Sequence, residues 1–328
     1  MGETIHVSPS PHVRDSVNTQ KIMAAVVIAL LPASLAGIIL FGFHALLVLI
    51  LSVASAVLSE FVFEKITKRP STLYDLSAVV TGLLIGLNMP PEIPLFIPVL
   101  GSVFGIIVVK QFFGGIGQNF MNPALGARCF LLISFSGQMT NFAVKGGILG
   151  RAAADAVSSA TPLVTLKMGE SYSLGSLFLG TVGGTIGETS ALAILIGAAF
   201  LLVMHVIDLK IPLCYIGTFT VLVLITALIR GYGSPVYFTL CEVFAGGLML
   251  GAWFMATDYA TSPMTPNGQI VYGVALGVLT YLFRMVSKSP EGVSYAIILM
   301  NCLTPMIEQY TRPRAFGVPR PKKEAKHE

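Results

Sequence analysis

Long apolar runs separated by polar stretches dominate the chain. Ten runs can be delimited, at residues 21–41, 44–63, 75–89, 94–110, 119–136, 189–207, 212–230, 237–255, 268–286 and 291–310. Most of them approach the roughly 20 residues that a helix needs to cross a bilayer. The alternating ten-residue pattern typical of membrane barrel strands does not occur. The sequence therefore predicts an all-α integral membrane protein with about ten transmembrane helices.

The longest polar connection, residues 137–188, divides the ten spans five and five. Matching spans of the two halves carry glycines four residues apart, which let helix backbones approach closely. These glycines are Gly82 and Gly86 in the third span, Gly247 and Gly251 in the eighth, Gly101 and Gly105 in the fourth, and Gly273 and Gly277 in the ninth. The pattern favours one five-helix unit used twice, and because five is odd, the second copy must be inverted. The alternative is that glycine is simply common in membrane helices.

Five segments follow from this division. They are a cytoplasmic N-terminal segment (1–20), a first five-helix repeat (21–136), an extracytoplasmic loop (137–188), a second five-helix repeat (189–310) and a basic cytoplasmic tail (311–328). With both termini inside, thirteen Lys and Arg residues face the cytoplasm and six face outward. Cytoplasmic loops are enriched in these residues, so the charge bias predicts a multi-pass protein of the cell inner or plasma membrane, in contact with lipid. The polar first 20 residues predict no cleavable signal peptide.

The composition excludes a water-soluble protein. Charged residues make up 11% of the chain, apolar residues make up 54%, and the mean hydropathy is +0.81. Soluble domains carry about 25% charged residues. The net charge of +4 is spread over loops and indicates no nucleic-acid partner. Four isolated cysteines without CxxC spacing predict neither a metal site nor an iron–sulfur cluster.

The loop between the two halves contains the short polar stretch DAVSSATPL, residues 155–163. Thr161 offers a hydroxyl group that an enzyme could join to a phosphate. Pro162 favours an extended and accessible backbone at that threonine. The residue types alone nevertheless favour an ordinary solvated loop.

This stretch resembles the flavinylation motif Asp-x-x-(Ser/Thr)-Gly-Ala-(Ser/Thr). Asp155, Ser158, Ala160 and Thr161 match the motif, and Ser159 stands in place of its glycine. The chain is similar, over nearly its whole length, to the family that comprises the D subunits of Rnf electron-transport complexes and the B subunits of sodium-translocating NADH:quinone reductases. The further segments that carry this resemblance are residues 71–91, 113–132 and 254–263.

The resemblance implies a flavoprotein subunit of a redox-driven ion pump. FMN would be bound covalently to Thr161 through a phosphoester formed by a flavin transferase. Electrons would pass between ferredoxin and NAD, coupled to translocation of Na⁺ or H⁺. The partners would be the other membrane and peripheral Rnf subunits, and this chain would hold no catalytic residue when alone. The resemblance also implies a fold similar to that of urea transporters, with two inverted five-helix repeats.

Asn119 and Asn122 lie three residues apart at the start of the predicted fifth span, which would place both amides on one helix face. Two such amides can hold a polar ring edge or a ribityl chain. They could equally cap the helix or bond a neighbouring backbone. The resemblance implies a second, non-covalent flavin, riboflavin, at Thr81, Asn119 and Asn122.

Arg128 lies halfway along the fifth span, where an unpaired guanidinium would be costly. It must therefore face a partner or a wet cavity, so it could pair with a carboxylate, bind a flavin or form an ion pair that only fixes packing. Glu60, Asp75 and Glu242 lie near span ends. Each could line an ion path, and the pattern favours a role as an interfacial anchor.

Two other classes of protein fit parts of the pattern. A solute channel or permease could share the urea-transporter-like fold, since a fold does not determine function. A purely structural subunit would leave the polar loop unexplained. The phosphate-binding pattern GxxxxGK[ST] is absent from the sequence, and no GxGxxG stands between a strand and a helix. The sequence therefore predicts that NAD and ATP bind to partners rather than to this chain.

Overall fold

The computed structural model describes residues 17–142, 163, 166, 173–231, 234–285 and 292–313, and within these ranges every regular element is helical. The α-helices are α1 (Thr19–Phe41), α2 (Phe43–Thr67), α3 (Ser77–Leu87), α4 (Phe96–Phe104), α5 (Pro123–Ser134), α6 (Ser136–Met139), α8 (Leu174–Leu179), α9 (Ala191–Val203), α10 (Lys210–Arg230), α11 (Pro235–Phe244), α12 (Leu248–Leu250), α13 (Pro266–Met285) and α14 (Val293–Thr311). The all-α prediction is confirmed for this part of the chain.

Five helical segments in the described ranges are long and apolar enough to cross a membrane. They are α1, α2, α10, α13 and the continuous segment Phe96–Phe113; α11 and the helix that follows it form a sixth candidate, bent by 63°. Helices α3, α5 and α9 are apolar but have only 11, 12 and 13 residues. A helix of 11 residues rises about 16 Å, roughly half of the hydrocarbon core. A multi-pass membrane protein is supported, and the count of ten spans stays a prediction.

The outer faces of the long helices are apolar. Ile28 and Leu35 on α1, Leu58 on α2 and Ile229 on α10 are all exposed. Exposed apolar surface on this scale needs a nonaqueous environment. The helices are therefore built to face lipid on one side and the protein core on the other.

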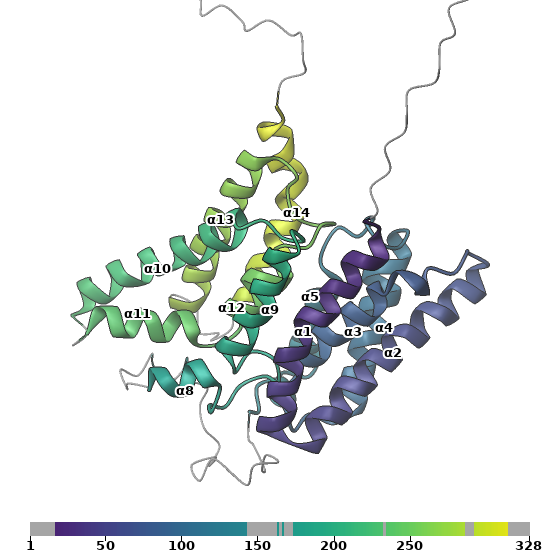
Figure 1. Cartoon of the computed structure of the whole chain (residues 1–328), viewed down its shortest axis with the longest axis horizontal. Helices are drawn as coiled ribbons and strands as arrows, with labels where there is room; N and C mark the ends of the chain where they lie inside the picture. Colours follow the sequence, from purple (N-terminus) through teal and green to yellow (C-terminus); the bar gives the residue numbers. More distant parts are fainter. Residues whose placement is uncertain are drawn as a thin grey trace, which may run out of the picture.

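The two halves of the chain meet along α1 and α9, which lie side by side in the middle of Figure 1. A Cβ atom added at Gly197 of α9 would overlap the carbonyl oxygen of Ala29 on α1. Close backbone contact of this kind requires glycine. Helix α1 begins and α14 ends at the same end of the bundle, while α8 lies at the opposite end.

We expect Gly197→Leu to disrupt this junction, because the backbone of α1 cannot move away without opening the core. Overpacking costs about 1–3 kcal/mol even where side chains can adjust, and thermal unfolding in detergent should show a loss of at least that size. Gly217→Ala on α10 is the matched control, since nothing lies within 4 Å of its added Cβ atom. A wild-type melting temperature for Gly197→Leu would contradict the assignment of this contact.

The glycines of these pairs lie at close contacts. Pairs at corresponding positions of the two halves, however, contact different kinds of neighbour. Gly82 packs on Val53 and Ser52 of α2, whereas Gly247 faces the carboxylate of Glu188. In the other pair of spans, Gly101 faces Leu131 on α5, and Gly273 and Gly277 face α10. The glycine spacing therefore reflects local close packing, and the inverted repeat stays a prediction.

Two π-helical segments interrupt the helices next to the interface between the halves. They are η2 (Gly105–Lys110), which continues α4, and η4 (Gly251–Met255), which continues α12. A π-helical turn adds a residue and shifts the helix face that follows it, and such turns are frequent at functional sites. Lys110 of η2 and Trp253 of η4 are both buried.

Candidate functional site: a cavity between the two halves

A cavity opens between the halves near the beginning of α1 and contains about 770 Å³ of empty space including its mouth. Its walls come from α1, α3, η2, the segment before α5, the end of α9, η4 and the loop after η4. Both π-helical segments contribute, through Lys110 and through Trp253 with Phe254. Cofactor sites in membrane bundles are expected at such interfaces between halves.

The structure brings Thr81, Asn119 and Asn122 together as lining residues of this one cavity. The Asn122 side chain accepts hydrogen bonds from the backbone of Ala124 at 3.0 Å and Leu125 at 3.4 Å, so it caps α5. Asn119 Nδ2 donates to the Met121 carbonyl at 2.9 Å, and Thr81 Oγ1 donates to the Ser77 carbonyl at 2.9 Å. The three side chains are thus held in place by the backbone while they face the cavity.

One sequence expectation about the asparagines was wrong. Helix α5 begins at Pro123, so Asn119 and Asn122 lie in the loop before it and not on one helix face. Proline fits the first position of a helix because its missing N–H would have no partner there. Asn122 has the expected capping role and Asn119 bonds a neighbouring backbone carbonyl, and both line the same cavity.

Residue types in the sequence do not reveal the aromatic side of the cavity, which an acidic side chain also lines. Trp253 lines it, and its Nε1 is buried without a hydrogen-bond partner in the described part of the chain. Asp258 also lines it, and Asp258 Oδ2 accepts from Thr261 Oγ1 at 3.2 Å. Burial raises the pKa of Asp258, against the opposite effect of hydrogen bonds from Ala260 and Thr261. In the sequence, Asp258, Thr261 and Ser262 follow the eighth predicted span, where a loop or a broken helix could place them near ions.

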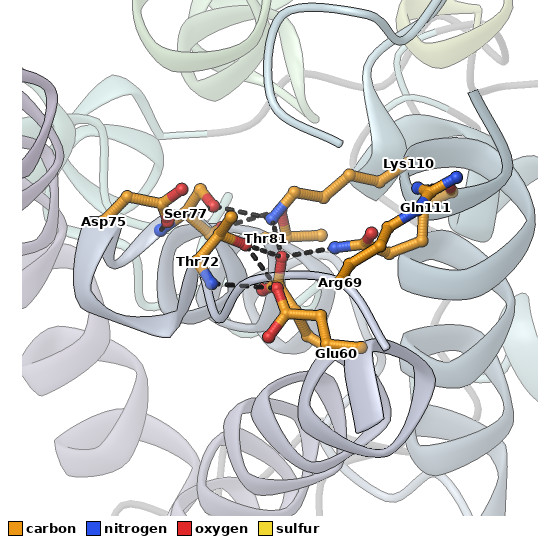
Figure 2. Close-up of polar contacts among 9 residues, drawn as sticks. Glu60, Arg69, Thr72, Asp75, Ser77, Thr81, Lys110 and Gln111 are labelled. Carbon is orange, nitrogen blue, oxygen red and sulfur yellow. Dashed lines mark hydrogen bonds and ion pairs between the residues drawn. The ribbon is translucent and has the colours of Figure 1, made fainter. Parts of the chain in front are cut away.

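A polar cluster adjoins the cavity, and we call it the Lys110 cluster (Figure 2). All of its members except Thr72 are buried. Its members are Glu60, Glu64, Thr72, Ser77, Lys110 and Gln111. Lys110 Nζ lies 2.7 Å from Glu60 Oε1 and 2.6 Å from Ser77 Oγ. Glu60 is 0% exposed and Lys110 2% exposed. The expected interfacial anchor at Glu60 was therefore wrong, because η2 turns Lys110 inward to meet the carboxylate.

Arg128 has the carboxylate partner that its position required. Its Nη1 donates to Glu188 Oε1 and to Asn88 Oδ1, and both Arg128 and Glu188 are buried. The pair joins α5 to the segment before α9. Arg128 does not line the cavity that holds Thr81.

A second buried arginine lies near the first. Arg284 Nη1 donates to the Glu242 carbonyl oxygen at 2.8 Å and lies 3.7 Å from Glu242 Oε2, so this carboxylate is buried rather than interfacial. Arg128, Arg284 and Leu163 line a small common cavity. Asp155, Ser158, Ala160 and Thr161, the residues of the flavinylation motif, lie outside the described residues.

Metal ligands are not grouped in the described ranges: no three His, Cys, Asp or Glu side chains there could hold a metal ion. The four cysteines, which all lie within these ranges, form no disulfide. The polar chemistry of this part of the molecule rests on hydrogen bonds and ion pairs.

These features define a multi-pass helical membrane protein with a cavity between its halves, mostly apolar and lined by a few polar side chains. The chain belongs to the NQR2, RnfD, RnfE family, whose model matches residues 6–317. The family resemblance seen in the sequence is therefore confirmed.

Several relatives match almost end to end. The D subunit of the Na(+)-translocating ferredoxin:NAD(+) oxidoreductase complex of Acetobacterium woodii is 47% identical over 98% of both chains. The D subunit of the proton-translocating ferredoxin:NAD(+) oxidoreductase complex of Clostridium ljungdahlii is 40% identical over 96% of both chains. The D subunit of the ion-translocating oxidoreductase complex of Stutzerimonas stutzeri is 38% identical over 93% of both chains.

Proposed function

We propose that this chain is a membrane flavoprotein subunit of a redox-driven ion pump. It would act with other Rnf-type membrane and peripheral subunits as part of a translocase that carries electrons between ferredoxin and NAD and moves Na⁺ or H⁺. The relatives just described, similar over nearly their whole length, support this assignment. They also disfavour the alternative of a solute channel or permease, because their names describe redox complexes.

The observation that carries the flavin assignment is the convergence of Thr81, Asn119 and Asn122 on one cavity. We assign riboflavin to this cavity. The isoalloxazine ring would lie against the apolar walls that include Trp253, while the amides and hydroxyl would bond its polar edge or the ribityl chain. Trp253 Nε1, which has no partner within the described ranges, is a donor that suits a ring carbonyl or a ribityl oxygen. The flavin supplies electron transfer, and the protein supplies position and electrostatics.

We assign the second flavin, FMN, to Thr161 through a phosphoester made by a flavin transferase. Leu163, two residues along the chain, is buried and packs near Arg284 and Gly246. It lies near α8, at the end of the bundle opposite the start of α1 and the riboflavin cavity. In the inner or plasma membrane, with cytoplasmic termini, the riboflavin cavity would open toward the cytoplasm and the FMN would lie outside.

We expect purified wild-type protein to release about one riboflavin per chain on denaturation, and Asn119→Leu to reduce this at least about tenfold. Losing a buried hydrogen bond costs about 1–3 kcal/mol, and about 1.4 kcal/mol is a factor of ten in affinity. Chromatography of the released flavins separates riboflavin from FMN. Gln118→Leu is the matched control, since Gln118 is exposed and does not line the cavity. Well-folded wild-type protein without extractable riboflavin would refute the assignment.

A further inference from the structure

A chain of hydrogen bonds leads from the protein surface to the cavity through the Lys110 cluster (Figure 2). Thr72 is exposed, and its Oγ1 lies 2.5 Å from Glu64 Oε1 and 3.2 Å from Glu60 Oε1. Glu60 Oε1 accepts from Lys110 Nζ at 2.7 Å, and Lys110 lines the cavity together with Ser77. The polar connection is therefore continuous from solvent to the wall of the cavity.

The charges of this cluster do not balance. Glu60 and Glu64 lie one helical turn apart on α2, both buried, with Lys110 as the buried cation between them and the cavity. Each carboxylate also has a buried Oε2 atom with no hydrogen-bond partner in the described part of the chain. Two buried carboxylates with one ammonium would leave an uncompensated negative charge, which is costly in a low-dielectric interior.

The other charged groups near the cluster lie toward solvent. Asp75 is partly exposed, and its Oδ1 accepts from the backbone and hydroxyl of Ser77 at 2.9 and 2.5 Å. Arg69 is exposed, and its Nη1 donates to the Gln111 carbonyl at 3.2 Å. Lys65 is exposed and lies over the ring of Phe61. Arg69 and Asp75 already have hydrogen-bond partners, so the buried charges of the cluster are those of Glu60, Glu64 and Lys110.

We propose that Glu60, Glu64 and Lys110 conduct protons from the surface at Thr72 to the flavin in the cavity, with Ser77 positioning the Lys110 ammonium. This inference rests on the proposed function, which places a redox-active flavin there. Glu64 is the proton-loading group, since it lies next to the exposed Thr72 hydroxyl. Lys110 is the terminal donor, since it belongs to both the cluster and the cavity wall.

Protons and electrons balance in the transfer from Lys110 to the flavin ring. With riboflavin bound, Lys110 would give one Nζ proton to the ring, and the two electrons that reduce the ring would come from ferredoxin through the complex. One N–H bond at the lysine breaks and one at the ring forms, so the ring gains two electrons and one proton. The glutamate pair returns a proton to Lys110, and water at Thr72 reprotonates the pair. The net change is transfer of one proton from solvent to the reduced ring.

The test combines flavin reduction kinetics with infrared difference spectra of the intact complex in lipid. We expect wild type to show the carbonyl band of a protonated carboxyl group that changes when the cavity flavin is reduced. Glu64→Gln should lose this band and slow proton-coupled reduction by about a hundredfold, the usual contribution of a positioned proton donor. Millimolar acetic or formic acid should restore much of the rate, which a purely structural role of Glu64 would not allow.

Two further variants keep the test decisive. Glu308→Gln is the matched control, because this glutamate on α14 accepts from the backbone of Met264 and lies far from the cluster in sequence. If Glu64→Gln folds poorly, the neutral pair Glu60→Gln with Lys110→Met removes both partners of the buried ion pair and should give the same slow reduction. A wild-type rate and band in variants that retain riboflavin would overturn the proton path alone. Wild-type protein that holds no riboflavin would overturn the proposed function and this inference with it.

Discussion

Thr161→Val is expected to abolish covalent flavin completely. A phosphoester needs an oxygen on the protein, and valine replaces the threonine hydroxyl by a methyl group of similar size. Intact mass of protein produced together with its flavin transferase should show an increase of one FMN in wild type and none in the variant. In-gel flavin fluorescence should disappear with it.

The fold should survive this change. The nearest described residues, Leu163 and Leu166, are 3% and 1% exposed and belong to the main core, so they anchor the chain on the C-terminal side of Thr161. Thr161→Val leaves both anchors intact. The variant should therefore still release riboflavin from the distant cavity, which separates loss of the attachment site from loss of structure.

Two controls locate the attachment within the loop. Thr165→Val removes another hydroxyl of the same segment and should leave the FMN mass in place. Thr161→Ser keeps a hydroxyl at the same position, and the motif allows serine there, so attachment should persist. A flavin mass retained on Thr161→Val protein would assign the bond to another residue.

The sequence predicted the helical class and the need for buried partners better than it predicted the partners themselves. The cost of a guanidinium in a span correctly required a partner for Arg128. Its partner, Glu188, is 60 residues further on, in the segment before α9, and no periodicity links the two positions. Sequence spacing reports neighbours on one helix, whereas this contact is made by tertiary packing.

Lys110 shows a different limit. It ends the predicted span 94–110 and was counted among the thirteen Lys and Arg residues on the cytoplasmic side. The π-helical turn of η2 instead directs the side chain inward, to a carboxylate 50 residues away. Helical periodicity assumes 3.6 residues per turn, so a π segment shifts the predicted face of the residues at its end.

The riboflavin residues show what family resemblance adds. The amide side chains at positions 119 and 122 left capping, backbone bonding and cofactor binding open, and Thr81 was linked to them by the resemblance alone. Resemblance grouped them, and the structure places all three on one cavity. The aromatic wall at Trp253 could not be grouped with them from residue types, because Trp253 lies in an apolar run of the other half of the chain.

The second large effect is expected at the buried ion pair between Arg128 and Glu188. Arg128→Met should destabilise the protein by about 3–5 kcal/mol, because it leaves the Glu188 carboxylate buried without its cation. The glutamate cannot turn away to solvent. A Cβ atom added at Gly247 would overlap Glu188 Oε1, so the second half of the chain already packs tightly against it. Unfolding by denaturing detergent in mixed micelles would measure the loss.

The double variant Arg128→Met with Glu188→Met should recover most of that stability, because a buried ion pair replaced by apolar side chains of similar size is often neutral or stabilising. Lys210→Met is the matched control: its pair with Asp208 spans 3.8 Å between side chains that are 47% and 66% exposed, and exposed pairs contribute about 0–1 kcal/mol. Equal stability of Arg128→Met and wild type would mean that the carboxylate is neutral in the folded protein. A double variant as unstable as the single one would instead place the cost in the lost contact between Arg128 and Asn88, which holds the end of α3 against α5.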